Sequence, residues 1–159
     1  MTSLDRTDYQ IIGLLRKNAR LSNKEVARQV GLAPSTCLVR TRMLQQSGAI
    51  TGFKAEVNPL ALGVGLQAMI AVRLKRHFKP DVEAFRQHAL DLPEVVRLYH
   101  VAGPIDFLCH VWARDPEHLR DLAMTAFTAR EEVSHIETEL IFEHVSCREL
   151  PSFLDQTAD

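Results

Sequence analysis

The sequence predicts an α+β protein of two domains, three N-terminal helices followed by strands and helices in the order βαββαβ. Three observations support this prediction. Apolar residues recur at helical spacing, with capping residues between the helices, over residues 5–48. From residue 66 onward, stretches that alternate every second residue are interleaved with two helical stretches. The formal charge also changes sign between the two parts.

Three helices are predicted in the first 48 residues. The first covers residues 5–18, beginning at an aspartate N-cap and carrying an apolar stripe of Ile and Leu. The second follows Ser22, which together with Glu25 has the spacing of a capping box, and it ends at a glycine. The third covers residues 34–48 and begins with a proline, where a missing N–H is tolerated. This order is typical of a helix-turn-helix unit, and we expect a winged helix-turn-helix domain here.

The third helix divides into two faces. Cys37, Thr41 and Leu44 share one side, while the opposite side carries two hydroxyls and an arginine and no acidic residue. Such a face suits the major groove of double-stranded DNA, because hydroxyls and arginine contact phosphates and base edges. The alternative is an amphipathic helix with a solvated polar face. The residues predicted to contact DNA, on or beside this face, are Ser35, Thr36, Val39, Arg40, Arg42 and Met43.

The chain is predicted to leave the helical domain through a strand and a hinge. Residues 49–57 alternate weakly, which favours a strand. An Asn-Pro turn signal and small residues up to Gly65 then favour a flexible connection. The predicted domains are residues 1–60 and 66–159, with the hinge at 61–65.

Four strands and two helices are predicted in the second domain, which is the order of a ferredoxin-like split βαβ unit. The first strand covers residues 66–75 and alternates cleanly, with Leu66, Ala68, Ile70, Val72 and Leu74 on one face. The remaining strands are predicted at residues 95–101, 105–113 and 135–146, and the helices open at Pro80-Asp81 and Asp115-Pro116. The second helix carries a stripe of Leu119, Leu122, Ala123 and Ala126, and the last strand is expected to point Ile136, Thr138, Leu140 and Phe142 inward.

Both helices are expected to cover one face of this sheet. The other face mixes large apolar groups with charges of both signs, so we expect it to bury against a second copy and form a homodimer. The alternative is a solvated sheet face. The residues predicted on this open face are Met69, Arg73, Arg97, Tyr99, Trp112, Glu137, Glu139 and Ile141.

The net charge of −1 conceals two blocks of opposite sign. Residues 1–60 hold nine basic and four acidic residues, whereas residues 61–159 hold ten basic and sixteen acidic ones. The alternative is that the charges are scattered at random along the chain. A basic first domain instead indicates that this domain binds a polyanion. No apolar run approaches the roughly 20 residues that span a bilayer, the N-terminus lacks the apolar core of a signal peptide, and the three cysteines form no pairing motif. We therefore expect a cytoplasmic protein without a membrane partner.

Residues 4–60 resemble the N-terminal domain of the Lrp/AsnC (leucine-responsive, or feast/famine) transcription regulators. Residues 66–151 are similar to the ligand-sensing domain of that family, including Gly103 and Asp106 in a Gly-x-x-Asp turn before an apolar strand. The N-terminal matches are Leu4-Asp5, Asp8, Ile11-Ile12, Leu14-Leu15, the run 19–27, Gly31-Leu32, Pro34-Ser35, Cys37-Leu38, Arg40, Leu44, Gly48 and Ile50.

The chain departs from the family pattern in the third helix. Ala33 stands where a serine usually precedes the proline, which removes an N-cap hydroxyl. Val39 and Met43 occupy positions where the family commonly has basic residues, and Gln45 replaces an acidic one. Arg40 and Arg42 remain as the main cations, so the sequence preference is expected to differ from that of other members.

The resemblance implies a sequence-specific DNA-binding regulator, with no catalytic role and no cofactor, whose second domain dimerises and often assembles four dimers into an octamer. An amino acid or related metabolite is expected between dimers, with backbone N–H groups near Gly103 binding a carboxylate and Asp106 an ammonium. The alternative role for Asp106 is to cap its own turn. The implied effector contacts are Ala102, Gly103, Pro104, Ile105, Asp106 and, from the last strand, Thr138.

Two other functions are weighed against this one. Sirohaem decarboxylases resemble the same two-domain family, and seven histidines in the second part keep a tetrapyrrole enzyme open as an alternative. A metal cluster of His100, His110 and His144 would require neighbouring strands and agreeing faces, so isolated histidines are the simpler interpretation and no metal site is predicted.

Overall fold

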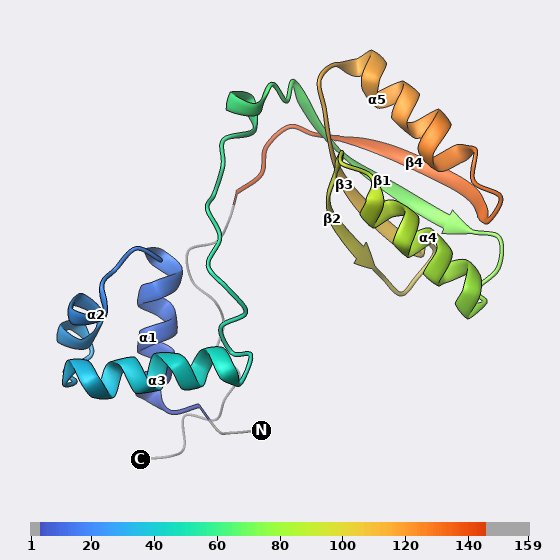
Figure 1. The fold of residues 1–159 in the computed structure, drawn as a ribbon. Coiled ribbons are helices and arrows are strands. Elements are labelled where there is room, and N and C mark those ends of the chain that lie inside the picture. Colours follow the sequence, from blue (N-terminus) through green and yellow to red (C-terminus); the bar gives the residue numbers. More distant parts are fainter. Residues whose placement is uncertain (1–3, 146–159) are drawn as a thin grey trace. The chain divides into compact units, whose positions relative to one another are not determined.

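The computed structural model describes residues 4–145. They divide into two compact units, one reaching to Glu56 and the other covering Val57–His144, and each is described by itself (Figure 1). No helix in the described part of the chain has the length and apolar character required to cross a membrane.

The first unit is built from three helices, α1 (Arg6–Lys17), α2 (Asn23–Gln29) and α3 (Pro34–Gln46). The predicted capping box of α2 is confirmed, because the Ser22 hydroxyl accepts from the N–H of Glu25 and the Glu25 carboxylate accepts from the N–H of Ser22. A second capping box, between Asp5 and Asp8, begins α1. These bonds satisfy N–H groups that a helix end leaves without intrahelical partners.

A small apolar core holds the three helices together. It consists of six buried residues, two from each helix: Ile11, Leu15, Val26, Ala27, Cys37 and Leu44. The predicted inward side of α3, with Cys37 and Leu44, is therefore confirmed. Ile50 packs against the same core, and its N–H donates to the Leu44 carbonyl oxygen at 3.0 Å. This bond turns the chain back toward the core after α3 ends.

The strand predicted over residues 49–57 is wrong. Residues 51–58 form neither helix nor strand, and the described residues up to Glu56 contain no second strand that would pair with it. A strand needs a neighbour for its backbone N–H and C=O groups, and alternation in the sequence does not supply one. Phe53 and Val57, which would have formed its apolar side, are about half exposed.

The connection into the second unit is ordered at its end. A 3₁₀ turn, η1 (Pro59–Leu62), is followed by Gly63 in the left-handed region and by Gly65, whose N–H donates to the Ala113 carbonyl oxygen at 3.0 Å. A Cβ on Gly65 would collide with the carbonyl oxygen of Arg114, so this position accepts only glycine. Gly65, the last residue of the predicted hinge 61–65, is therefore hydrogen-bonded to the end of β3.

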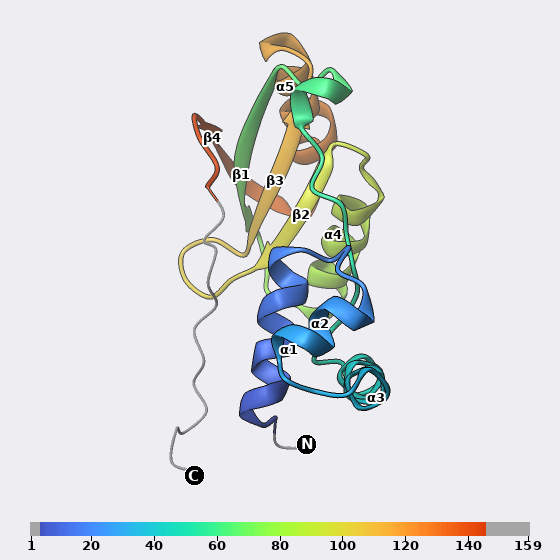
Figure 2. The same ribbon diagram turned by 90° about the vertical axis from the view of Figure 1, so that its left-hand side faces the viewer.

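The second unit is a four-stranded antiparallel sheet in the order β2-β3-β1-β4, with two helices on one face (Figures 1 and 2). This is the predicted ferredoxin-like βαββαβ arrangement. The elements are β1 (Leu66–Leu74), α4 (Lys79–Asp91), β2 (Val95–His100), β3 (Phe107–Ala113), α5 (Pro116–Leu122) with its continuation η2 (Ala123–Thr128), and β4 (Val133–Ile141).

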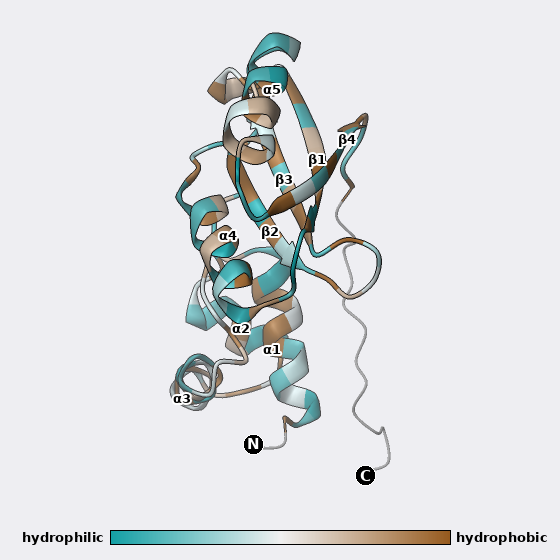
Figure 3. Cartoon of the chain, turned by 90° about the vertical axis from the view of Figure 1, so that its right-hand side faces the viewer, coloured by the Kyte–Doolittle hydropathy of each residue, from teal (hydrophilic) through white to brown (hydrophobic). Residues whose placement is uncertain are grey.

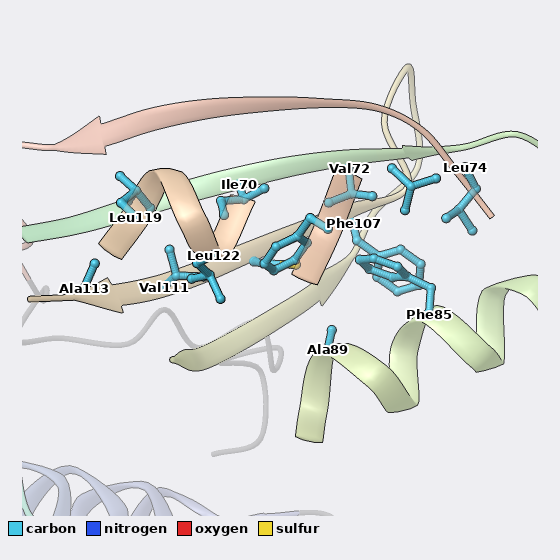
Figure 4. Packing of buried hydrophobic residues seen from close by; sticks show 14 residues of the cluster. Ile70, Val72, Leu74, Phe85, Ala89, Phe107, Val111, Ala113, Leu119 and Leu122 are labelled. Atoms are coloured by element: carbon cyan, nitrogen blue, oxygen red, sulfur yellow. The ribbon is translucent and has the colours of Figure 1, made fainter. Parts of the chain in front are cut away.

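The core of this unit lies between the sheet and the two helices. Residues of β1 and β3 that alternate along each strand meet Phe85 and Ala89 of α4 and Leu119 and Leu122 of α5 (Figure 4). The ring centroids of Phe85 and Phe107 are 4.9 Å apart. Hydrophobic and hydrophilic residues alternate along the strands, as the period of a half-covered sheet requires (Figure 3). The predicted inward face of β1 is confirmed.

The last strand is shorter and less covered than predicted. β4 begins at Val133 and ends at Ile141, so Phe142 lies beyond it and is 99% exposed. Thr138 and Leu140 pair with the buried residues Ile70 and Ala68 of the neighbouring strand β1, yet both are exposed. The helical cover reaches only the first part of β4, where Val133 is buried in the core, and leaves Thr138 and Leu140 open. Of the four residues expected to point inward, only Ile136 packs against the core.

The opposite face of the sheet carries the predicted set of mixed residues. The strand register places Met69 opposite His110 and Glu139, and Gln67 opposite Trp112 and Ile141. No helix of the described residues 57–144 contributes to this face, because the helix residues that pack on the sheet all join the core on the other side. We call the face defined by Met69, Arg73, Arg97, Tyr99, Trp112, Glu137, Glu139 and Ile141 the open sheet face.

Candidate DNA interface and ligand site

The N-terminal end of α3 has no side-chain cap. Ala33 occupies the N-cap position with φ −64° and ψ 142°, the extended conformation that a capping residue adopts, but it has no oxygen to accept a bond. The start of the helix is fixed from α2 instead, since the Asn23 side-chain amide donates to the Pro34 carbonyl oxygen at 2.7 Å.

The face of α3 that the sequence assigns to DNA is mostly exposed. Ser35, Thr36, Val39, Arg42 and Met43 are all exposed, while Cys37 and Leu44 on the other side are buried. Among the described residues Arg42 has no ion-pair partner. The exposed residues therefore lie together on one surface, and the sequence supplies it with no carboxylate.

Arg40 is placed differently from its predicted neighbours. Its Nη1 atom lies 2.7 Å from Oδ2 of Asp5 and 2.9 Å from Oδ1 of Asp8, and its side chain is 33% exposed. These two bonds raise the pKa of the guanidinium. The Asp8 N–H and the Arg40 side chain together lower the pKa of Asp5. Arg40 thus ties α3 to the first turn of α1, and its role toward DNA stays a prediction.

The Gly-x-x-Asp turn joins β2 to β3. The N–H of Val101 donates to the Asp106 carbonyl oxygen and the N–H of Asp106 donates to the Val72 carbonyl oxygen, both at 2.9 Å. Gly103 has φ 132°, a conformation that residues with a side chain rarely adopt. Ala102, Gly103 and Pro104 are exposed and Ile105 is half-buried.

Asp106 is only 7% exposed and its carboxylate is already bound within the unit. Oδ2 accepts from the N–H of Leu74 at 2.8 Å, and Oδ1 lies 2.7 Å from Nδ1 of His77. The side chain therefore bonds the end of β1 and the segment after it, rather than capping its own turn. The pairing was not visible in the sequence, because Leu74 and Asp106 are 32 residues apart.

Thr138 is not brought to this turn by the sheet order. It lies on β4, which is separated from β3 by β1, and it pairs with Ile70 rather than with Val72 beside the turn. Within one chain, the turn 102–106 forms a single surface patch and Thr138 forms a separate one.

The histidines do not converge. No group of three or more His, Cys, Asp or Glu side chains among the described residues is arranged to hold a metal ion. His100 stacks on Phe107 at 4.7 Å between ring centroids, on the helix-covered side. His110 lies on the same side of the sheet as the open sheet face, where its Nε2 is 2.9 Å from Oε1 of Gln67 and its ring is 6.4 Å from that of His144. Burial, followed by the nearby Arg97 and His144, lowers the pKa of His110.

The cysteines that the structure describes are buried thiols. Cys37 lies in the helical core and Cys109 in the sheet core, where burial raises the pKa of the Cys109 thiol to about 12. Both therefore act as small apolar groups. Cys147 lies outside the described residues.

Comparison with known proteins assigns both units. Residues 4–51 match the model of winged helix-turn-helix DNA-binding domains, and residues 67–151 match that of the Lrp/AsnC ligand binding domain. A DNA-binding domain followed by a ligand-binding domain defines a class of transcription regulators that respond to small molecules. The chain belongs to the Lrp/AsnC family of these regulators.

Individual relatives resemble this protein in sequence or structure along most of the chain. It is 42% identical over 142 residues to the HTH-type transcriptional regulator AldR of Mycolicibacterium smegmatis, covering 89% of this chain and 83% of that one. It is 33% identical to the leucine-responsive regulatory protein of Rhizobium meliloti, covering 89% and 91%. The crystal structure of a transcriptional regulator of Neisseria meningitidis in complex with L-Met has a TM-score of 0.84 at 28% identity, covering 91% and 94%. These relatives are transcription regulators and not enzymes, so the decarboxylase alternative has no support.

Proposed function

We propose that this DNA-binding regulator acts in the cytoplasm as a homodimer, or an octamer of four dimers. It contacts DNA through the exposed face of α3, under the control of an amino acid or related metabolite bound at the 102–106 turn. The observation that carries the proposal is the pairing of an exposed, acid-free α3 face with a separate ligand-binding unit in one chain.

The start of α3 and its exposed side offer groups that bind the DNA backbone. Arg42 extends from the exposed side of α3, and Ser35 and Thr36 lie in its first turn, where backbone N–H groups carry no side-chain cap. Helix N-termini and hydroxyls bind phosphate oxygens, and arginine adds a fixed positive charge. Ser35, Thr36 and Arg42 therefore position the helix, while Arg40 is held toward Asp5 and Asp8.

Salt dependence tests this division between Arg42 and Arg40. The probe is a duplex selected from a random-sequence library by the full chain, and its affinity is measured from about 50 to 200 mM salt, where each neutralised phosphate contributes about 0.9 to the log–log slope. Arg42→Ala is expected to lower the slope by about that amount. Arg40→Ala, the matched control, should leave the slope unchanged. Wild-type affinity that does not vary with salt would contradict the proposed DNA interface.

The effector binds at the carboxylate of Asp106. Asp106 has one oxygen committed to the Leu74 N–H, and the other faces His77, whose side chain is largely exposed. An amino acid's ammonium binds this second oxygen by displacing His77, and its carboxylate binds the backbone N–H groups near Gly103. Ala102, Pro104 and Ile105 then contact its side chain. The relative from Neisseria meningitidis, solved with L-Met, supports an amino acid as the effector class. Thr138 contacts the effector only if it comes from another subunit, or if the effector is large enough to extend from the turn to β4.

A thermal-shift panel of the common amino acids tests the effector site. The true effector is expected to raise the melting temperature with the logarithm of its concentration over Kd. His77→Ala should strengthen this response, because it removes the group that competes for Asp106. A response that His77→Ala weakens would overturn the assigned geometry, and a panel with no response would exclude the amino acids tested.

The open sheet face is the proposed dimer surface. It mixes Met69, Tyr99 and Trp112 with charges of both signs, which is typical of a surface that meets a copy of itself. Met69→Glu is expected to yield monomers in sedimentation velocity. Leu140→Glu on the opposite face of the sheet, where Leu140 is 54% exposed, should leave the assembly unchanged. Monomers in the wild type would remove this part of the proposal.

A further inference from the structure

The exposed face of α3 is more apolar at its centre than a helix that reads DNA by hydrogen bonds alone would require. Val39 is 55% exposed and Met43 is 53% exposed. Residues four apart lie on one helix stripe, so the two side chains follow each other along the axis by about 6 Å. They are not needed for the helical core, because α3 packs through Cys37 and Leu44 on its other side.

One of the two charged residues beside this stripe, Arg40, points away from it. Arg40 adjoins Val39 in the sequence, but its guanidinium bonds to Asp5 and Asp8 of the α1 capping box. The polar groups that remain on the exposed face are Ser35 and Thr36 at its N-terminal end, Gln46 at its C-terminal end and Arg42 beside the stripe. The middle of the face therefore offers methyl and thioether groups.

The major groove presents one apolar group to such a surface, the C5 methyl of thymine. The other groups by which the base pairs are distinguished there are hydrogen-bond donors or acceptors. Pressing Val39 or Met43 against those edges would displace water and leave polar groups unpaired, which is unfavourable. An apolar stripe therefore favours thymine, whose methyl group it can bury, over bases whose polar groups it would leave unpaired.

We propose that Val39 and Met43 read thymine methyl groups in the major groove and set the sequence preference of this regulator. The inference rests on the proposed binding of DNA through α3. An axial separation of about 6 Å corresponds to roughly two base-pair steps, so each half-site should contain two critical thymines about that far apart.

Deoxyuridine substitution tests the inference at the level of one methyl group. In the duplex selected by the full chain, each thymine is replaced in turn by deoxyuridine, which lacks only the C5 methyl. Two positions in each half-site are expected to lose about fourfold in affinity, the value of one buried methyl, and the others to change little.

Protein variants assign each position to a side chain. Val39→Ala should abolish the effect of deoxyuridine at one of the two positions, and Met43→Ala at the other. Gln45→Ala is the matched control, because Gln45 is exposed on the same helix but lies about 120° around it from Val39. This control should leave the deoxyuridine pattern as in the wild type.

The outcomes separate this inference from the proposed function. Salt-dependent binding that is insensitive to deoxyuridine at every position would overturn the methyl readout while leaving DNA binding through α3 in place. Variants that change the sedimentation coefficient without changing base preference would show instead that the stripe contacts another protein chain. Failure of the full chain to enrich any duplex would contradict both.

Discussion

Arg40 in the first unit and Asp106 in the second are two charged residues that the sequence singles out for binding a partner, and both are bound inside their own unit. They differ in their surroundings. Arg40 has a partly exposed guanidinium that pairs with the exposed carboxylate of Asp5 and the largely covered carboxylate of Asp8. Asp106 is buried and accepts from a backbone N–H that has no access to water. The burial of its bonded partner, rather than the charge itself, therefore decides how much each residue contributes to the stability of its unit.

The same difference bears on function. A surface ion pair contributes little to stability, because both groups are well hydrated when they are apart. A buried carboxylate bonded to the backbone cannot be released without leaving a donor unpaired. A ligand at the 102–106 turn therefore competes with His77 for Asp106 but leaves the bond to Leu74 intact.

Removing the Asp106 carboxylate is expected to have the largest effect on stability. Asp106→Ala leaves the buried Leu74 N–H without an acceptor, which we expect to lower the free energy of unfolding of the second unit by about 2–3 kcal/mol in urea denaturation. Asp106→Asn retains an acceptor oxygen and should lose clearly less. If the two variants were equally stable, the backbone bond would not be the source of the effect and the comparison would fail.

Helix caps should have an intermediate effect in the first unit, where polar groups at helix ends supplement a small core. Ser22→Ala removes half of the α2 capping box and is expected to destabilise the unit by about 1 kcal/mol. Ala33→Ser adds a hydroxyl to the uncapped α3, whose N-cap backbone is already extended, and is expected to stabilise it by about 0.5–1 kcal/mol. Thermal melts of both variants should shift in opposite directions; a downward shift for Ala33→Ser would show that the position cannot cap.

Breaking the surface pair should have the smallest effect. Arg40→Gln is expected to lower stability by roughly 0.5 kcal/mol at neutral pH, the scale of exposed ion pairs. Because the folded pKa of Asp5 is lowered from 3.8, the stabilisation is complete above pH 3.8 and is lost as pH falls through the folded pKa. The difference between wild type and Arg40→Gln should therefore shrink in acid. A difference that grows in acid would mean that Arg40 acts through another group.

Much of the fold followed from local patterns. Helix ends were predicted where side chains bond to nearby backbone, as at Ser22 and Glu25, and sheet faces where alternation was long, as in β1. Partners distant in sequence could not be predicted, which is why Arg40 was assigned to DNA alone and the bond from Leu74 to Asp106 was missed. The strand at 49–57 failed for the same reason, because alternation does not show whether a neighbour exists.

The candidate sites were predictable to different degrees. Exposure along α3 follows from helical periodicity, so the positions of Val39 and Met43 on the outer side agree with the expected faces. The turn at 102–106 was located by its glycine and aspartate, but the competing His77 had no signal in the sequence. Its position depends on how β1 ends beside β3.

The π-helical turn η2 should allow the second unit to lose one residue from this segment without losing its core packing. In a continuous α-helix, Leu119 and Phe127 would lie about 80° apart around the axis, yet both belong to the core. The wider turn over Ala123–Thr128, seen in the bond from the Ala129 N–H to the Met124 carbonyl oxygen, brings Phe127 back into line. With one residue fewer here, an ordinary α-helix would bring the same phenylalanine within about 20° of Leu119. This segment therefore carries a spare residue, and a single deletion is the kind of evolutionary change it should survive.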